Sequence, residues 1–345
     1  MSLKSLVILA LVIIVGGVSY YYIAAGSKDS VSDEDIWLIP GLAQNLGQVT
    51  KLTVHGPGNN LLAEISKSDH HWVVANRDHY EADIAVVRNA FDTLANARLI
   101  EKKTAKPNNY GMIGVEDISD ALAQGIQFAV SGLDEPVVVV VGKEGSLQNT
   151  QFVRRAGDTQ SWLLDRKLAL NRDGAWWLRK DIMDILPEQI RSIRISHKDG
   201  SEVLIESKSQ EGYEFALGQP IPKGKKVSES ELYQVANALS SLQLRDVASL
   251  QSFKEEILPS AITTFRMYDG LRVVVTTFSK GKETYVKLGI AFDDADGLVQ
   301  SDSAKVEEFV QKTRSRTEGW AFILPSITQD AMVKRLDDIL LRDDM

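Results

Sequence analysis

The sequence predicts an α+β protein, with an N-terminal transmembrane helix followed by two tandem, related, strand-rich α+β repeats. Two observations lead to this prediction. The run Leu6–Ala25 carries no charge and has the length of about 20 residues that a helix needs to cross a bilayer. Beyond it, the two halves of the chain show the same order of short apolar strands, an aromatic residue, an amphipathic helix, further strands and a closing helix.

Residues 1–27 are expected to be a cytoplasmic tip and a membrane anchor. Lys4 is the only charged side chain before the run, which favours a cytoplasmic amino terminus. Three tyrosines stand at the far end, where aromatic rings prefer the membrane interface. A cleaved signal peptide is the alternative, with a cut after Gly26. The residues assigned to the anchor are Leu6, Ile13, Gly16, Gly17, Tyr20, Tyr21, Tyr22 and Ala25.

Residues 28–47 are expected to be a linker that contains a short apolar segment. The stretch 26–35 is small and acidic, as in flexible spacers. It is followed by Trp37-Leu-Ile-Pro-Gly-Leu42, which is broken by a Pro-Gly turn. This segment has two interpretations: a plug that packs against the first repeat, or a peptide that docks on a partner. On the second interpretation the candidate contact residues are Trp37, Pro40 and Gly41.

The two repeats are expected to span residues 48–187 and 188–345. The pattern Val49-x-x-Leu52-x-Val54 recurs as Ile190-x-x-Ile193-x-Ile195, and turn residues follow both copies. Within the predicted central helices, the segment 89–94 (Asn-Ala-Phe-Asp-Thr-Leu) matches the segment 237–242 (Asn-Ala-Leu-Ser-Ser-Leu). The spacing of apolar residues also predicts a closing helix in each repeat. The residues on these two faces are Leu178, Ile182 and Ile185 in the first repeat, and Met332, Val333, Leu336, Ile339 and Leu340 in the second.

The residues that usually carry chemistry are sparse. The chain has no cysteine, which excludes disulfides, thiolate catalysis and cysteine-ligated metals. Its five histidines do not form a compact metal-ligand pattern, and it has no Gly-x-x-x-x-Gly-Lys phosphate loop. The acidic stretch 293–297 lacks the acidic first and twelfth ligands of a calcium loop. We therefore expect no catalytic residue, no metal and no cofactor.

Two further features bear on ligands. Trp176-Trp177 is either a surface that stacks on a sugar or, more commonly, a pair split between the core and its rim. The formal net charge of −8 argues against a protein that binds nucleic acid or an anionic membrane face.

Several short motifs resemble those of the bacterial DUF4340 family, a domain of unknown function. They are, in order, Leu38-Ile-Pro-Gly-Leu42, Trp72, Tyr80-x-Ala82-Asp83, Tyr110-Gly-Met-Ile-Gly-Val115 and Val141-Gly-Lys143. The resemblance covers most of the chain outside the anchor. It implies an envelope accessory protein encoded beside ABC transporters of the gliding-motility type, and it implies no catalytic residue.

Three functions therefore remain as expectations. The first is a non-enzymatic protein of the inner membrane, single-pass and mainly periplasmic, that serves as an accessory or interaction subunit of an ABC-type transporter. The second is a periplasmic module that binds glycan or lipid. The third is a hydrolase with a dispersed acidic site.

Overall fold

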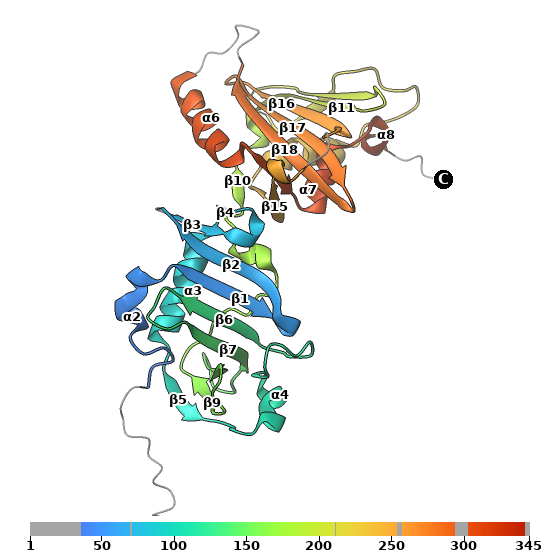
Figure 1. The fold of residues 1–345 in the computed structure, drawn as a ribbon. Helices are drawn as coiled ribbons and strands as arrows, with labels where there is room; N and C mark the ends of the chain where they lie inside the picture. Colours follow the sequence, from blue (N-terminus) through green and yellow to red (C-terminus); the bar gives the residue numbers. More distant parts are fainter. Residues whose placement is uncertain (1–35, 70, 211, 254–256, 294–302, 342–345) are drawn as a thin grey trace, which may run out of the picture.

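The computed structural model describes residues 36–341 except 70, 211, 254–256 and 294–302. It is strand-rich and of the α+β class, and it consists of two units that lie end to end (Figure 1). The predicted anchor, from Leu6 to Ala25, lies outside the described residues. Among the helices that are described, none is both long enough and apolar enough to span a membrane.

The first unit is built on an antiparallel sheet with the strand order β4-β3-β2-β1-β6-β7-β8-β9-β5. Its helix α3 (Ile84–Asn96) covers one face, beside the short helix α2 (Leu42–Asn45) (Figure 1). The short helix α4 (Tyr110–Ile113) packs on the opposite face, where Tyr110 and Val140 belong to a separate apolar cluster. The strands are β1 (Lys51–Gly56), β2 (Asn60–Ser68), β3 (His71–Val74), β4 (Tyr80–Glu81), β5 (Leu99–Lys102), β6 (Ile126–Ser131), β7 (Val137–Glu144), β8 (Gln151–Arg155) and β9 (Ser161–Leu164). The 3₁₀ turns are η1 (Leu46–Gln48), η2 (Pro57–Asn59), η3 (Ala75–Arg77), η4 (Pro107–Asn109) and η5 (Gly174–Trp177).

The second unit is built on an antiparallel sheet with the order β13-β12-β11-β16-β17-β18-β19-β15. Its strands are β11 (Ile190–His197), β12 (Glu202–Ser207), β13 (Phe215–Leu217), β15 (Asp246–Ser249), β16 (Ala261–Met267), β17 (Leu271–Lys280), β18 (Glu283–Phe292) and β19 (Trp320–Ile323). Its helices and 3₁₀ turns are η6 (Pro187–Gln189), α5 (Glu229–Ala236), η7 (Asn237–Leu239), η8 (Leu250–Ser252), α6 (Ser303–Thr317), α7 (Ser326–Met332) and α8 (Leu336–Ile339).

The strands of the two sheets correspond position by position. If β1 is equated with β11, then β3-β2-β1-β6-β7-β8-β9-β5 has the same order as β13-β12-β11-β16-β17-β18-β19-β15. The first sheet adds β4 at one edge. The strands that share motifs in the sequence, β1 and β11, therefore occupy equivalent places.

The central helices differ between the units. Asp83 caps α3 by accepting hydrogen bonds from the backbone N–H groups of Ala85 and Val86, at 2.8 and 3.2 Å. The predicted helical segment 89–94 lies wholly inside α3, and Leu94 is fully buried. In the second unit the α-helix ends at Ala236, and Leu242 lies in the short strand β14 (Leu242–Gln243). Of the segment 237–242, only residues 237–239 are helical, as the 3₁₀ turn η7. The helix predicted over the rest of the segment is wrong.

The closing helix predicted for the first unit is also wrong. Ile182 lies in the strand β10 (Asp181–Met183), and Leu178 forms an isolated bridge with Ala82. The apolar spacing fits a helix, but β10 pairs with β14 and lies against α6, so this segment forms its backbone hydrogen bonds as a strand of the second unit. The closing helix of the second unit is present in two pieces, α7 and α8, on either side of Lys334 and Arg335.

The junction of the units is held by main-chain and side-chain contacts. The Arg77 guanidinium lies 2.8 Å from the Asp246 carboxylate, and the Ser249 N–H donates to Asp78 at 2.8 Å. The Tyr80 ring meets that of Trp320 edge to face, with ring centres 4.9 Å apart. Burial, and secondarily the charge of Glu81, raises the pKa of Tyr80 to about 12. One contiguous cluster of buried apolar side chains runs through both units.

A tight turn on the first sheet uses three glycines. The helix α4 ends at Gly114, whose φ of +72° favours glycine. A Cβ built on Gly142 of β7 would lie 2.3 Å from the carbonyl oxygen of Ile113, and one on Gly125 would lie 2.5 Å from that of Gly114. The Lys143 ammonium donates to the carbonyl groups of Gly111 and Met112, at 3.1 and 3.2 Å. The motifs around Tyr110 and Lys143 are thus one structural contact.

Truncation of either central leucine should destabilise the whole protein. Leu94 and Leu242 are 0% and 2% exposed, so Leu94→Ala and Leu242→Ala should each lower the free energy of unfolding by about 2–5 kcal/mol. Because the core is continuous, each change should shift a single urea transition. Leu122→Ala is the matched control, since Leu122 is 84% exposed. Two separate transitions, only one of which moves, would contradict the shared core.

A side chain at Gly142 should loosen the turn on β7. We expect Gly142→Ala to cost about 1–3 kcal/mol in urea unfolding, because the new Cβ collides with backbone oxygens that cannot move independently. A Cβ on Gly47 would meet nothing within 4 Å, so Gly47→Ala should change stability by less than about 0.5 kcal/mol. Equal effects of the two substitutions would show that the approach at Gly142 is not required.

Candidate functional site

The segment that contains the predicted contact residues packs into the first unit. Leu38 and Leu42 are fully buried, and the Leu38 N–H donates to the carbonyl of Ala97 at 2.8 Å. The Arg155 guanidinium donates to the carbonyl oxygens of Leu38 and Trp37, at 2.9 and 2.7 Å. The segment is therefore a plug.

The three candidate contact residues lie on the outside of this plug. Trp37 is 38% exposed, with the Arg98 guanidinium 6.0 Å from its ring centre. Pro40 and Gly41 are exposed, and Gly41 has the positive φ that starts α2. Packing of the buried leucines thus leaves Trp37, Pro40 and Gly41 at the surface, and their contact with a partner stays a prediction.

The Trp176-Trp177 pair is split between core and rim, as the sequence suggested. Trp177 is 3% exposed and Trp176 is 36% exposed. Asp173 fixes this 3₁₀ turn by accepting the N–H of Ala175 at 2.9 Å. One ring of the pair therefore lies in the core and the other at the surface, and both rings line a groove.

The groove lies between the start of α3 and the segment that carries the tryptophans. It encloses about 270 Å³. Its floor includes Phe128 of β6, which is 1% exposed. Its lining residues are Ala85, Val86, Asn89, Ala90, Phe128, Leu168, Ala169, Trp176 and Trp177. Apart from the Asn89 amide and the indole N–H groups, these side chains are apolar, which is typical of a site for a small hydrophobic group.

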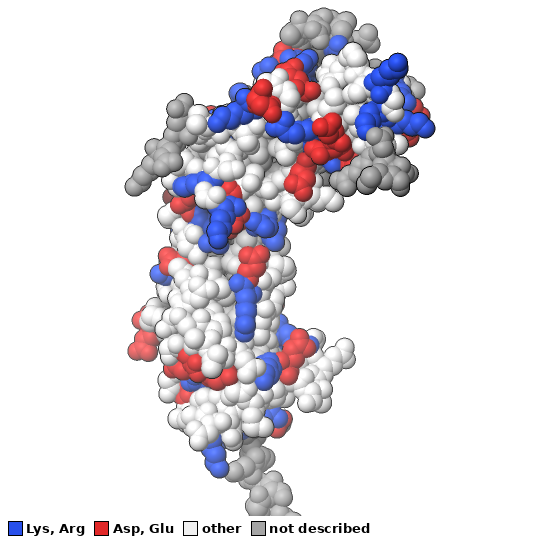
Figure 2. Space-filling model, turned by 90° about the vertical axis from the view of Figure 1, so that its right-hand side faces the viewer, with Lys and Arg blue, Asp and Glu red and all other residues white. Residues whose placement is uncertain are grey.

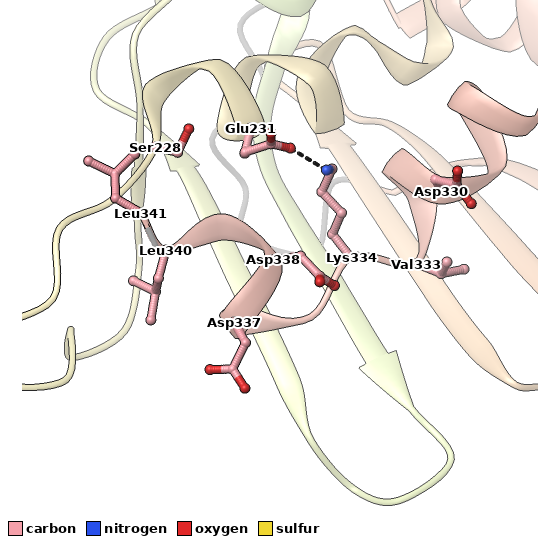
Figure 3. Close-up of a pocket in the computed structure, with 9 residues that line it drawn as sticks. All are labelled: Ser228, Glu231, Asp330, Val333, Lys334, Asp337, Asp338, Leu340 and Leu341. Carbon is pink, nitrogen blue, oxygen red and sulfur yellow. Dashed lines mark hydrogen bonds and ion pairs between the residues drawn. The ribbon is translucent and has the colours of Figure 1, made fainter. Parts of the chain in front are cut away.

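A second, polar hollow of about 600 Å³ lies beside α8 (Figure 3). Glu231 of α5 binds the ammonium group of Lys334, whereas Asp337 projects away from them. Asp338 accepts the backbone N–H of Arg335 at 2.8 Å. Glu231 and Asp338 are thus engaged separately, and Asp337 projects away, so these three carboxylates do not converge on one point, as a pair of hydrolytic carboxylates must.

The described histidines are dispersed. His71 and His79 are exposed, His55 lies on β1, and His197 is 9% exposed with Nε2 3.3 Å from the carbonyl oxygen of Lys334. His70 and most of the acidic stretch after Asp293 lie outside the described residues. Among the residues that the structure describes, no group of three or more His, Cys, Asp or Glu side chains is arranged to hold a metal ion.

Charge is mixed over the surface. Figure 2 shows acidic and basic side chains interspersed on one face, with wide uncharged areas over the lower unit. Asp293 illustrates the mixing, because Arg266 and Arg272 both lie about 3 Å from its carboxylate, at 3.1 and 3.0 Å. On this face the surface has no single large field of one sign.

Comparison with known proteins gives one match. Neither a curated protein nor a solved structure matches the chain. Residues 72–260 match the family described as "Domain of unknown function (DUF4340)". This match covers more than half of the chain and includes Tyr80, the Tyr110–Val115 turn, Lys143 and both groove tryptophans. With the matching motifs now placed in the structure, the chain belongs to the DUF4340 family.

Proposed function

We propose that this protein is a non-enzymatic, single-pass protein of the inner membrane that acts as an accessory subunit of an ABC-type transporter. Its bulk stands in the periplasm, and its two units are copies of one ancestral unit. The observation that supports this proposal is the position at which the described chain enters the first sheet.

The chain enters at the sheet edge farthest from the junction. Ile36 accepts the N–H of Leu99, and Trp37 bridges Arg98, so the entry lies beside β5. Tyr80, at the opposite edge in β4, contacts the second unit. Eight strand spacings of about 4.8 Å separate these edges by roughly 40 Å.

This geometry suits a spacer. An anchor in residues 1–27 would attach the protein at the plug, and the bonded junction would hold the second unit away from the membrane. The exposed Trp37 would then lie nearest the membrane, where a transporter subunit is within reach. Aromatic side chains are enriched at protein interfaces, which supports a contact there.

A second candidate function, the binding of an envelope lipid or glycan, is favoured by the groove beside Trp176. A concave, mainly apolar site with a few polar groups is the usual form of a small-ligand site. This function is compatible with the first, since the groove and the plug use different residues.

The topology follows from the uncharged run and from Lys4. Alkaline phosphatase fused after residue 345 should be active, because that enzyme works only outside the cytoplasm, and the same reporter fused after residue 4 should be inactive. A carboxyl-terminal reporter that is active only in the cytoplasm would overturn the orientation.

Contact with the transporter should centre on the plug. A photo-reactive phenylalanine at position 37 or 40 of the full-length chain, irradiated in membranes, should yield a crosslinked product that contains a transporter subunit. The same residue at position 122 is the control, because Leu122 is more exposed than Trp37 but lies on another surface loop. Mass spectrometry identifies the products. Equal capture from all three positions, or no membrane protein from positions 37 and 40, would contradict the proposal.

A further inference from the structure

The groove beside Trp176 has walls from two distant parts of the sequence. The first turns of α3 supply Ala85, Val86 and Asn89, and the segment before β10 supplies Ala169 and Trp176. Ala85, Asn89 and Ala169 are exposed, so the groove is open to solvent along one side. Its volume is about 270 Å³, and the alanine side chains in its walls are small enough to leave this space between the elements.

The lining selects a hydrocarbon over a sugar. Water is displaced favourably from apolar walls by an apolar group. A sugar ring buried here would leave most of its hydroxyl groups without partners, because the Asn89 amide is the main polar side chain of the walls. An extended alkyl chain has no such cost.

One cation next to a lining residue favours a polar head on this ligand. The Lys180 ammonium lies 5.9 Å from the centre of the ring of Trp176, which lines the groove. An anionic oxygen on a ligand that lies against Trp176 suits this ammonium group.

The nearby carboxylates are already engaged. Asp83 accepts the N–H groups of Ala85 and Val86 at the start of α3, and Asp173 accepts that of Ala175. Glu81 forms hydrogen bonds of 2.9 Å with the Arg179 guanidinium. These three carboxylates therefore do not compete with a ligand for Lys180.

We propose that the groove binds one hydrocarbon chain with an anionic carboxylate head, that is, a long-chain fatty acid. The chain lies over Phe128 and against Trp176, and the carboxylate faces Lys180. This inference names the ligand of the second candidate function and rests on it; it does not depend on the transporter contact.

The test uses the full-length protein in membrane vesicles. A fatty acid that carries a diazirine and an alkyne is added, the sample is irradiated, and labelled peptides are mapped by mass spectrometry. Labels should fall on residues 85–90 and 168–177, and excess dodecanoate should remove them. Ala169→Leu, which fills the groove, should abolish this labelling. Lys180→Ala should weaken the apparent affinity roughly fivefold, the loss expected for one partly exposed ion pair.

Two controls keep the result interpretable. Lys102 lies 5.7 Å from the centre of the Trp162 ring, so Lys102→Ala removes a comparable cation from an aromatic ring elsewhere and should leave labelling unchanged. Ala156→Leu enlarges an exposed alanine outside the groove and should do the same. Unchanged urea midpoints of all four variants confirm that folding is retained.

Three outcomes overturn the fatty acid as ligand. They are labelling spread over the surface without competition by dodecanoate, labelling insensitive to Ala169→Leu, and competition by methyl glycosides in place of dodecanoate. The last outcome would retain a ligand site at the groove but replace the lipid by a sugar. None of them bears on the crosslinks from positions 37 and 40, so the two proposals fail separately.

Discussion

The pairing of β10 with β14 is the constraint on which the rest of the molecule depends. β10 follows the first unit in the sequence, yet its partner comes after α5 of the second. Further main-chain hydrogen bonds run beside it, from Ile185 to Leu239 at 3.1 Å and from Leu244 to Lys180 at 2.9 Å. With the Tyr80 and Trp320 rings packed next to this ladder, the units cannot rotate about a free linker. The end-to-end arrangement is therefore part of the fold.

The sequence predicts those elements whose signals are local. The 3.6-residue spacing predicts α3, and the apolar run from Val137 predicts β7. The helical spacing of Ile182 and Ile185 predicts a closing helix in the first unit, and this prediction is wrong, because the segment forms the strand β10. A partner strand from the other unit decided the outcome, and that partner is visible only in three dimensions.

The groove likewise could be predicted only in part from the sequence, because its walls come from distant segments. The Trp176-Trp177 pair is conspicuous in the sequence. One ring is buried in the core and the other lies at the rim, as suits a large apolar residue that also carries a polar N–H group. What makes a groove is the set of small residues opposite, Ala85 and Ala90 of α3. Alanine in a helix carries no signal of its own, and more than 80 residues separate it from the tryptophans. The importance of Lys180 likewise appears only when its distance to the Trp176 ring is known.

The pairing of β10 with β14 also sets an order on folding. A chain made from its amino terminus completes the nine strands of the first sheet while β10 is still without a partner. Gln243, whose side chain donates to Asp181, follows it by 62 residues. At about 5–20 residues per second, the ribosome takes roughly 3–12 s to supply that partner. During this interval the edge around Tyr80 and Ile182 is uncovered, so the nascent first unit is the species that a chaperone would meet.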